Sequence, residues 1–309
     1  MDDAEIINWL LKGDVSIQFQ TYRDLLAEER PDLQNRIANE GWGAQFMSFR
    51  NSEGFWGLGF YQPKWICSHY TLLDLRNLCI SPYHPQIQES INHILTFEKG
   101  KDGGINPAGA TYASDLCING MALNYASYFK SPEEKLTSVV DFILDNQMPD
   151  GGFNCRSLRA KVHHSSLHTS LSVLEGFQEY INSGYTYRID EILKVVQKVQ
   201  EFILMHRLYH SDRTGEIINE NFLKLRYPGR WYYDILKALD YFQSAKLSYD
   251  NRMAEAISYL KNKRQKDGRW KLPSAHPGQV HFKMENAGQP SRWNTLRAMR
   301  VLKEYDRNA

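Results

Sequence analysis

The segment 147–177 carries three histidines and one cysteine within fourteen residues. His164 and His168 are four residues apart, so on a helix their imidazoles would share one face, which is the spacing of paired metal ligands. Cys155, in the turn before them, would add a thiolate, and His163 lies beside the pair. We therefore regard His164, His168 and Cys155 as a candidate Zn²⁺ site. The alternative is that the HxxxH spacing is accidental and that Cys155 is a small buried hydrophobic residue.

Two aspartates, Asp115 and Asp234, each precede an apolar helical pattern. Two carboxylates that face one cavity would permit acid–base catalysis, with His168 as their partner, as in the sugar-cleaving enzymes built on (α/α)6 barrels. An aspartate at a helix start is also a common N-cap, which is a structural role. The sequence leaves both interpretations open.

These residues belong to a larger set at the starts of the helices that we expect to be buried. Aligning those helices on their apolar residues gives one column of polar and aromatic residues: His69, Asp115, His168, Tyr233 and Trp293. The neighbouring column is Tyr70, Leu116, Thr169, Asp234 and Asn294. Together with His163, these columns predict a central cavity that suits a partly apolar ligand. The alternative is that they cap helices and satisfy buried backbone groups.

Three arginines lie near the same predicted rim: Arg226, Arg230 and Arg292. A guanidinium there would bind a phosphate or a carboxylate, or would pair with acidic loop residues. Arg226 and Arg230 belong to the aromatic and basic segment "RYPGRWYYD" (226–234), which we expect to hang over the cavity as an extra loop.

The elements that must position these residues come from a repeat. Glycines at turns recur at spacings of 49, 48, 64 and 53 residues: Gly54, Gly103, Gly151, Gly215 and Gly268. Each turn is followed by an apolar helical pattern and then by a more polar helix with an apolar stripe. With the segments 4–11, 14–29 and 31–51, the count is six inner and six outer helices. The sequence therefore predicts an all-α, (α/α)6 toroid, with residues 1–309 as a single domain.

The composition excludes several classes of function. The 309 residues include 37 Lys and Arg against 36 Asp and Glu, so a nucleic-acid partner is not expected. Neither a signal peptide nor a membrane-spanning segment is evident. The four cysteines form no CxxC motif, which favours reduced thiols in a cytoplasmic protein. Aromatic residues make up 13% of the chain, which is enough to line a concave site.

The repeat resembles that of the terpenoid cyclase and protein prenyltransferase superfamily. The matching motifs are "NQMPDGGF" at Asn146 and "RQKDGRW" at Arg264, with weaker copies at "EGFWG", "KDGGI" and "RTGEI". The catalytic signatures of that superfamily are missing, since neither DxDD nor DDxxD occurs. At the positions of the prenyltransferase zinc ligands the chain has His163, Ser165 and Trp293, so the zinc set does not carry over. No helical partner subunit is evident.

The leading hypothesis is a prenyltransferase-like or cyclase-like protein that binds or transforms a partly apolar small molecule, such as an isoprenoid, in a central cavity. The catalytic residues would be Asp115 or Asp234 with His168. No organic cofactor is implied, and Zn²⁺ is the metal that the histidines would hold. One alternative is a carbohydrate-active enzyme that uses the two aspartates. The other is a non-catalytic interaction module.

Overall fold

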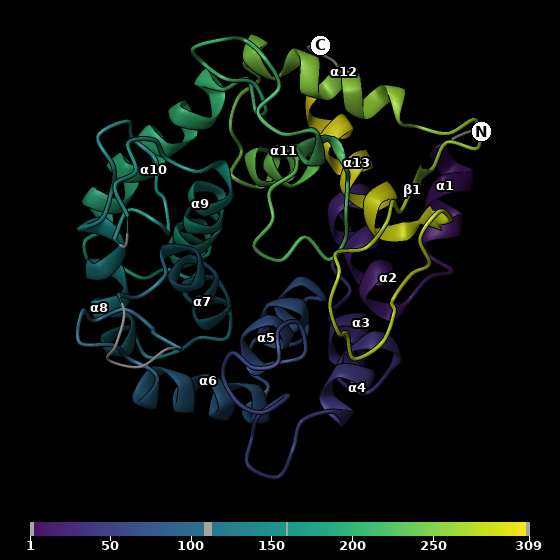
Figure 1. The fold of residues 1–309 in the computed structure, drawn as a ribbon. Helices are drawn as coiled ribbons and strands as arrows, with labels where there is room; N and C mark the ends of the chain where they lie inside the picture. Colours follow the sequence, from purple (N-terminus) through teal and green to yellow (C-terminus); the bar gives the residue numbers. More distant parts are fainter. Residues whose placement is uncertain (1–2, 108–112, 159, 307–309) are drawn as a thin grey trace. The chain divides into compact units, whose positions relative to one another are not determined.

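The computed structural model describes residues 3–107, 113–158 and 160–306, and within these ranges it divides into two compact units. Unit 1 comprises residues 3–48, 77–81 and 204–306, and unit 2 comprises residues 49–76 and 82–203. Figure 1 labels their helices in chain order. No helix of the described residues is both long and apolar enough to cross a lipid bilayer.

Unit 2 alternates along the chain between buried and half-exposed helices. The buried helices are α5 (Ser68–Asn77), α7 (Leu116–Tyr128) and α9 (Leu167–Asn182). The half-exposed helices are α6 (Pro85–Phe97), α8 (Glu133–Leu144) and α10 (Ile189–Met205). In the second group apolar residues recur every three or four positions, as expected for a helix with one face against a core. The predicted alternation of inner and outer helices is confirmed here.

Helices α7 and α9 lie side by side in unit 2 (Figure 1), and two glycines bring their backbones together. A Cβ atom added at Gly176 would lie 2.4 Å from the carbonyl oxygen of Gly120. One added at Gly120 would lie 2.6 Å from the carbonyl oxygen of Ser172. Neither position has room for a side chain, so these small residues set the distance between the two helices.

Unit 1 contains the remaining helices and one small sheet. Its helices are α1 (Asp3–Leu10), α2 (Val15–Thr21), α3 (Pro31–Arg36), α4 (Gly41–Ser48), α11 (Ile235–Ser244), α12 (Ala254–Asn262) and α13 (Arg292–Tyr305). Short helical turns are the π-helix η1 (Tyr22–Leu26) and the 3₁₀ helices η3 (Glu220–Leu223) and η4 (Asn251–Met253). Strands β1 (Trp270–Lys271) and β2 (Pro290–Ser291) pair antiparallel, with Trp270 opposite Ser291. The expected outer element 31–51 is divided into α3 and α4, because Gly41 adopts a positive φ of 58°.

The five recurring glycines share one conformation, since each has a φ between 73° and 91°. In four of the repeats the backbone N–H two residues after the glycine donates to a polar side chain at the start of the following buried helix. The pairs are Trp56 with Ser68 Oγ, Ile105 with Asn119 Oδ1, Phe153 with Ser170 Oγ and Trp270 with Thr295 Oγ1, at 2.7–3.1 Å. We call this interaction the turn–helix clasp. It gives a buried backbone N–H a hydrogen-bond acceptor.

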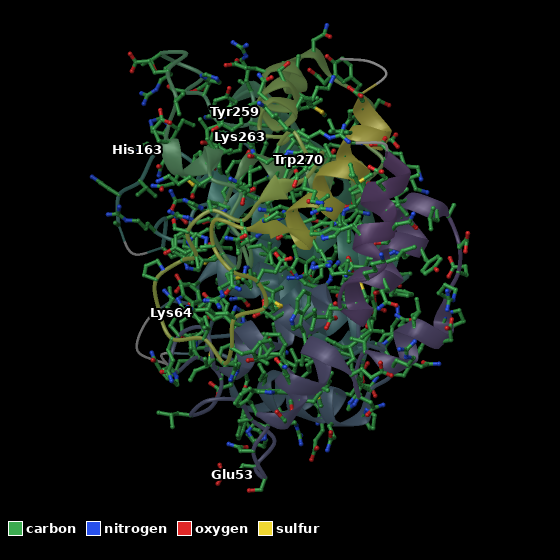
Figure 2. All side chains as sticks on the ribbon, turned by 90° about the vertical axis from the view of Figure 1, so that its right-hand side faces the viewer. Glu53, Lys64, His163, Tyr259, Lys263 and Trp270 are labelled. Carbon is green, nitrogen blue, oxygen red and sulfur yellow. The ribbon has the colours of Figure 1, made fainter. Side chains whose placement is uncertain are left out.

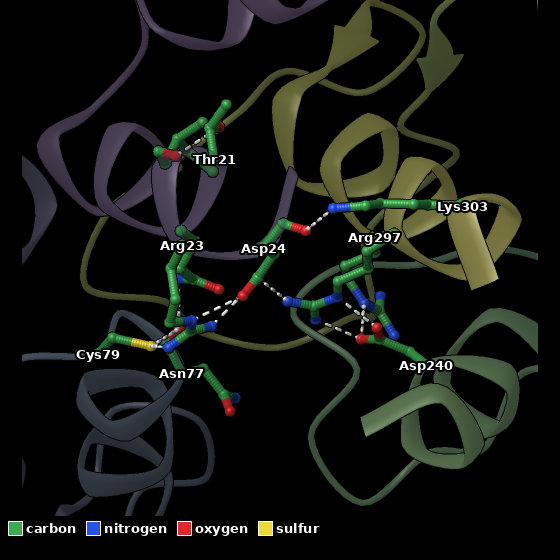
Figure 3. A network of polar contacts seen from close by, with 11 residues as sticks. Thr21, Arg23, Asp24, Asn77, Cys79, Asp240, Arg297 and Lys303 are labelled. Carbon is green, nitrogen blue, oxygen red and sulfur yellow. Dashed lines mark hydrogen bonds and ion pairs between the residues drawn. The ribbon is translucent and has the colours of Figure 1, made fainter. Parts of the chain in front are cut away.

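Unit 1 also contains a network of charged side chains that are each 6–16% exposed (Figure 3). Asp240 on α11 accepts hydrogen bonds from Arg297 and Arg300 on α13, with the Arg297 contact at 3.0 Å. Arg300 Nη1 also donates to Asp24 of η1 at 2.9 Å. These guanidinium groups keep the pKa of Asp240 below its usual range despite its burial. The network joins α11, α13 and η1, and removal of one member would leave another charge buried without its partner.

The turn–helix clasp can be tested with two serines of α9 that are both fully buried. We expect Ser170→Ala to lower the free energy of unfolding by about 1–3 kcal/mol, because the Phe153 N–H loses its acceptor. Ser172→Ala should change it by less than about 0.5 kcal/mol, since Ser172 Oγ only donates to the His168 carbonyl within the same helix. Urea unfolding of the two variants measures the difference, and equal midpoints would show that the clasp does not stabilise the fold.

Candidate functional site

Several of the predicted site residues lie at helix starts. His69, His168 and Trp293 are the second residues of α5, α9 and α13. Asp115 and Asp234 are the N-cap residues of α7 and α11, and Tyr233 stands immediately before Asp234.

The alignment of these residues into one column is wrong. Counted from the clasp side chain, His168 and Trp293 each stand two positions before it, so these two are equivalent. His69 stands one position after Ser68, and Asp115 stands four positions before Asn119. An apolar period of about 3.6 residues tolerates shifts of three or four positions, so the apolar pattern cannot fix the register.

The structure does not gather the predicted zinc ligands. Helix α9 begins at Leu167, so His164 lies in the loop before it and does not share a helix face with His168. His163, labelled in Figure 2, and His164 are both exposed. Among the described residues there is no group of three or more His, Cys, Asp or Glu side chains that could hold a metal ion. Ser165, which matched a zinc-ligand position, instead donates its N–H and its hydroxyl to Asp150.

Cys155 has a different neighbour from the one expected. Its Sγ accepts the backbone N–H of Cys117 at 3.0 Å and the hydroxyl of Thr169 at 3.4 Å. The thiol is therefore part of a cysteine pair, which the sequence analysis missed because 38 residues separate the two in the chain.

His69 and Tyr70 lie in an aromatic cluster of unit 2. His69 is fully buried, and its Nδ1 lies 3.4 Å from Tyr125 Oη. Tyr70, also fully buried, exchanges a hydrogen bond with Tyr61 at 3.1 Å. Within the described part of the chain, His69 Nε2 has no hydrogen-bond partner. Burial lowers the pKa of His69 to about 3, so its imidazole is neutral at physiological pH.

The two aspartates differ in their surroundings. Asp234 is 3% exposed, and its Oδ1 accepts the Lys237 N–H at 2.8 Å, which is the N-cap bond of α11. Burial raises the pKa of Asp234 to about 6, against the opposing effect of Arg297. Asp115 is half-buried, and its side chain makes no capping bond. The two residues belong to different units.

Three further predicted pocket residues have structural partners. Arg230 is buried, and its carbonyl accepts Lys237 Nζ at 2.8 Å. The Tyr233 hydroxyl donates to the Leu208 carbonyl. Arg292 donates Nε to the Trp9 carbonyl at 3.2 Å, and its guanidinium lies 4.4 Å from the centroid of the Trp9 ring. Arg292 therefore holds α1 against the start of α13.

The strongest concentration of chemical groups in unit 1 lies around the segment 226–232. Arg226 Nη1 is 3.5 Å from His276 Nδ1, and the His276 ring stacks on Tyr232 with centroids 3.8 Å apart and planes 7° apart. Tyr232 also stacks on Trp231 at 3.9 Å. All four side chains are half-buried. We call Arg226, Trp231, Tyr232 and His276 the Arg226–His276 cluster.

An aromatic stack adjoins this cluster. Trp293 stacks on Tyr227 at 4.5 Å and on Trp42 at 6.0 Å, and Asn294 Nδ2 donates to the Leu225 carbonyl at 2.6 Å. Three buried polar atoms here have no hydrogen-bond partner among the described residues: Arg226 Nε, Trp293 Nε1 and Asn294 Oδ1. Buried polar groups are normally paired, so these three atoms are exceptions to that rule in unit 1.

Sequence reasoning missed His276, Trp42 and Glu285. His276 lies in the loop between β1 and β2, and no periodicity links it to Tyr232. Glu285 accepts the Ser291 hydroxyl at 2.5 Å and the Arg292 N–H at 2.6 Å, and so holds the start of α13. Its pKa is raised by burial. For His276 and Glu285, the only signal in the sequence was the length of the loop between β1 and β2 that contains them.

No protein-family model matches the chain, and no curated protein sequence matches it. Among solved structures, a polysaccharide lyase matches 99% of this chain and 98% of its own, with 13% identity and a TM-score of 0.58. A glycosyl hydrolase family 88 protein from Bacteroides vulgatus matches 78% of this chain and 73% of its own, with 13% identity and a TM-score of 0.44, too low to support an argument. The fold is the predicted α/α toroid.

The resemblance to terpenoid cyclases and prenyltransferases is wrong, because the match over the whole chain is to a polysaccharide lyase. The hypothesis of a prenyltransferase-like or cyclase-like protein falls with it, and an isoprenoid ligand has no support. The Gly-rich motif that carried the resemblance belongs to the turn–helix clasp, which is a structural interaction and identifies no reaction.

The buried His69 predicts a pH dependence of stability. Its folded pKa of about 3 lies below the unfolded value, so between these values the unfolded chain binds a proton that the folded chain does not. The contribution of His69 to the free energy of unfolding is therefore fully present above about pH 6.5 and is lost as the pH falls. The loss is about 2 kcal/mol between pH 7 and pH 5. His69→Phe should remove this part of the pH dependence.

The measurement is urea unfolding of the wild type and the variant at both pH values. His163→Phe, at an exposed position of the same unit, serves as the control and should retain the wild-type difference. If His69→Phe loses as much stability on acidification as the wild type, the imidazole is not held neutral by burial.

Proposed function

We propose that the chain is a carbohydrate-active enzyme that cleaves an acidic polysaccharide by β-elimination, with the Arg226–His276 cluster as its reaction centre. The observation that most supports this proposal is that the guanidinium of Arg226, the imidazole of His276 and the phenol of Tyr232 lie next to one another in unit 1. The likeness of the whole chain to a polysaccharide lyase supports the class of substrate.

The chemistry of these groups suits an elimination at a uronic acid. Arg226 would bind the carboxylate in a charge-assisted contact, which makes the neighbouring C–H more acidic. His276 would remove that proton, since histidine is the side chain that most often acts as a general base. The Tyr232 hydroxyl would donate a proton to the departing glycosidic oxygen. The aromatic rings of the cluster and of the adjoining stack would contact the apolar faces of the sugar units.

Hydrolysis by carboxylates is the second candidate. One observation favours it: burial raises the pKa of Asp234 to about 6, which is the range of a general acid at neutral pH. The capping bond to Lys237 is the opposing observation, because it engages one carboxylate oxygen in holding α11. Asn is as good an N-cap as Asp, so Asp234→Asn separates the two roles.

The test is a panel of acidic and neutral polysaccharides, followed by ultraviolet absorbance for the unsaturated product of elimination and by a reducing-end assay for either reaction. We expect absorbance to rise with an acidic polymer only. His276→Gln should lower the rate at least ~100-fold, the usual worth of general acid–base catalysis. Arg226→Ala should lower kcat/KM about 10- to 100-fold, through loss of a charged hydrogen bond.

Arg213→Ala, at an exposed position of the same unit, is the matched control and should keep full activity. Asp234→Asn should also remain active if elimination is the reaction. New reducing ends without absorbance, together with an inactive but folded Asp234→Asn, would replace elimination by hydrolysis. Binding of a polysaccharide without any cleavage would leave a non-catalytic module.

A further inference from the structure

The sulfur of Cys155 accepts hydrogen bonds from two donors, and the proposed reaction does not use this sulfur. It accepts the Cys117 N–H at 3.0 Å, close to the N-terminus of the 13-residue helix α7, and the Thr169 hydroxyl at 3.4 Å. The Cys155 N–H in turn lies 3.3 Å from Thr169 Oγ1, which fixes the thiol between the starts of α7 and α9. These donors stabilise a negative charge on sulfur.

A second cysteine, Cys117, has its backbone next to this sulfur. The Cys117 N atom is 3.0 Å from Cys155 Sγ, and an N–Cα bond adds about 1.5 Å, so the Cys117 Cα lies within about 4.5 Å of that sulfur. A disulfide requires such closeness between the two residues. Both cysteines are free thiols and are half-buried.

The pKa values of the two thiols shift in opposite directions. The hydrogen bond from the Cys117 thiol, together with that of Thr169, lowers the pKa of Cys155 to about 7. The same hydrogen bond and burial raise the pKa of Cys117 well above its usual range. The phenol of Tyr61 is another titratable group that interacts with both sulfurs. Of the two thiols, Cys155 is therefore the one that ionises first, while Cys117 keeps its proton to higher pH.

We propose that Cys155 is a modification site at which hydrogen peroxide is reduced, and that Cys117 resolves the oxidised sulfur as a reversible intrachain disulfide. In the first step the Cys155 thiolate attacks one peroxide oxygen. An S–O bond forms, the O–O bond breaks and hydroxide leaves, so sulfur loses two electrons to the peroxide. In the second step Cys117 sulfur attacks Cys155 sulfur, and the hydroxyl group leaves with a proton as water. Two thiols and one peroxide thus give one disulfide and two waters.

The other two cysteines provide internal comparisons. Cys67 is fully buried in unit 2. Cys79, 8% exposed, belongs to unit 1, where Arg23 Nη1 lies 3.5 Å from its sulfur but the sequence places no second cysteine. Cys79 therefore has a charged donor without a resolving thiol, and is the matched control.

The experiment treats the reduced full-length chain with equimolar hydrogen peroxide, followed by digestion and mass spectrometry with and without reductant. We expect a reducible cross-link between the peptides that contain Cys117 and Cys155, and none to Cys67 or Cys79. Cys117→Ser should abolish the cross-link and leave a sulfenic acid at Cys155, which dimedone traps. Cys155→Ser should abolish both, and Cys79→Ser should change neither.

Iodoacetamide labelling of the unmodified chain gives a second readout that needs no variant. Cys155 should be alkylated at least ~10-fold faster than Cys79 at neutral pH, as expected for a stabilised thiolate. A cross-link that involves another cysteine, peroxide-treated Cys155 that stays reduced, or equal labelling rates for the two cysteines would each overturn the proposal.

Discussion

In four of the repeats a hydrogen bond joins the Gly-rich turn to the following buried helix, and the remaining structure depends on this interaction. It spans 12, 14, 17 and 25 residues in the four repeats that contain it, while its length stays between 2.7 and 3.1 Å. The start of each buried helix is thus held at a fixed place, whatever the length of the loop between turn and helix. Without this hydrogen bond, loops of such different lengths would not place the helix starts at equivalent positions relative to the turns.

In both units, residues that hold the helix starts can be distinguished from residues that are available for a reaction. Most polar residues at the helix starts serve the scaffold: Asp234 caps α11, Arg292 holds Trp9 and Glu285 binds the N-terminus of α13. Two residues with unused chemical capacity lie in the clasped loops. Cys155 lies in the loop closed by Ser170, and His276 lies in the loop closed by Thr295. Variation of loop length and content on a fixed scaffold is a common route to new sites.

The helical repeat could be predicted from the sequence, but the contacts that form the candidate site could not. The turn glycines and the apolar spacing predicted the repeat, and the structure gives all five turn glycines a positive φ. Local periodicity does not fix register, however, so His69 and Asp115 were aligned with residues that are not their equivalents. The pairing of Cys117 with Cys155, and of Arg226 with His276, depends on contacts across 38 and 50 residues. Long-range contacts of this kind leave no periodic trace in the chain. The resemblance to cyclases failed because the shared motif is structural.

The most direct test of the proposed reaction centre is a crystal structure of the His276→Gln variant with an acidic oligosaccharide. The variant keeps the binding groups but lacks the proposed base, so an uncleaved ligand should remain in place. We expect its carboxylate on the Arg226 guanidinium and its glycosidic oxygen beside Tyr232. A ligand bound elsewhere, with Arg226 and Tyr232 untouched, would contradict the assignment of the Arg226–His276 cluster as the site of polysaccharide cleavage.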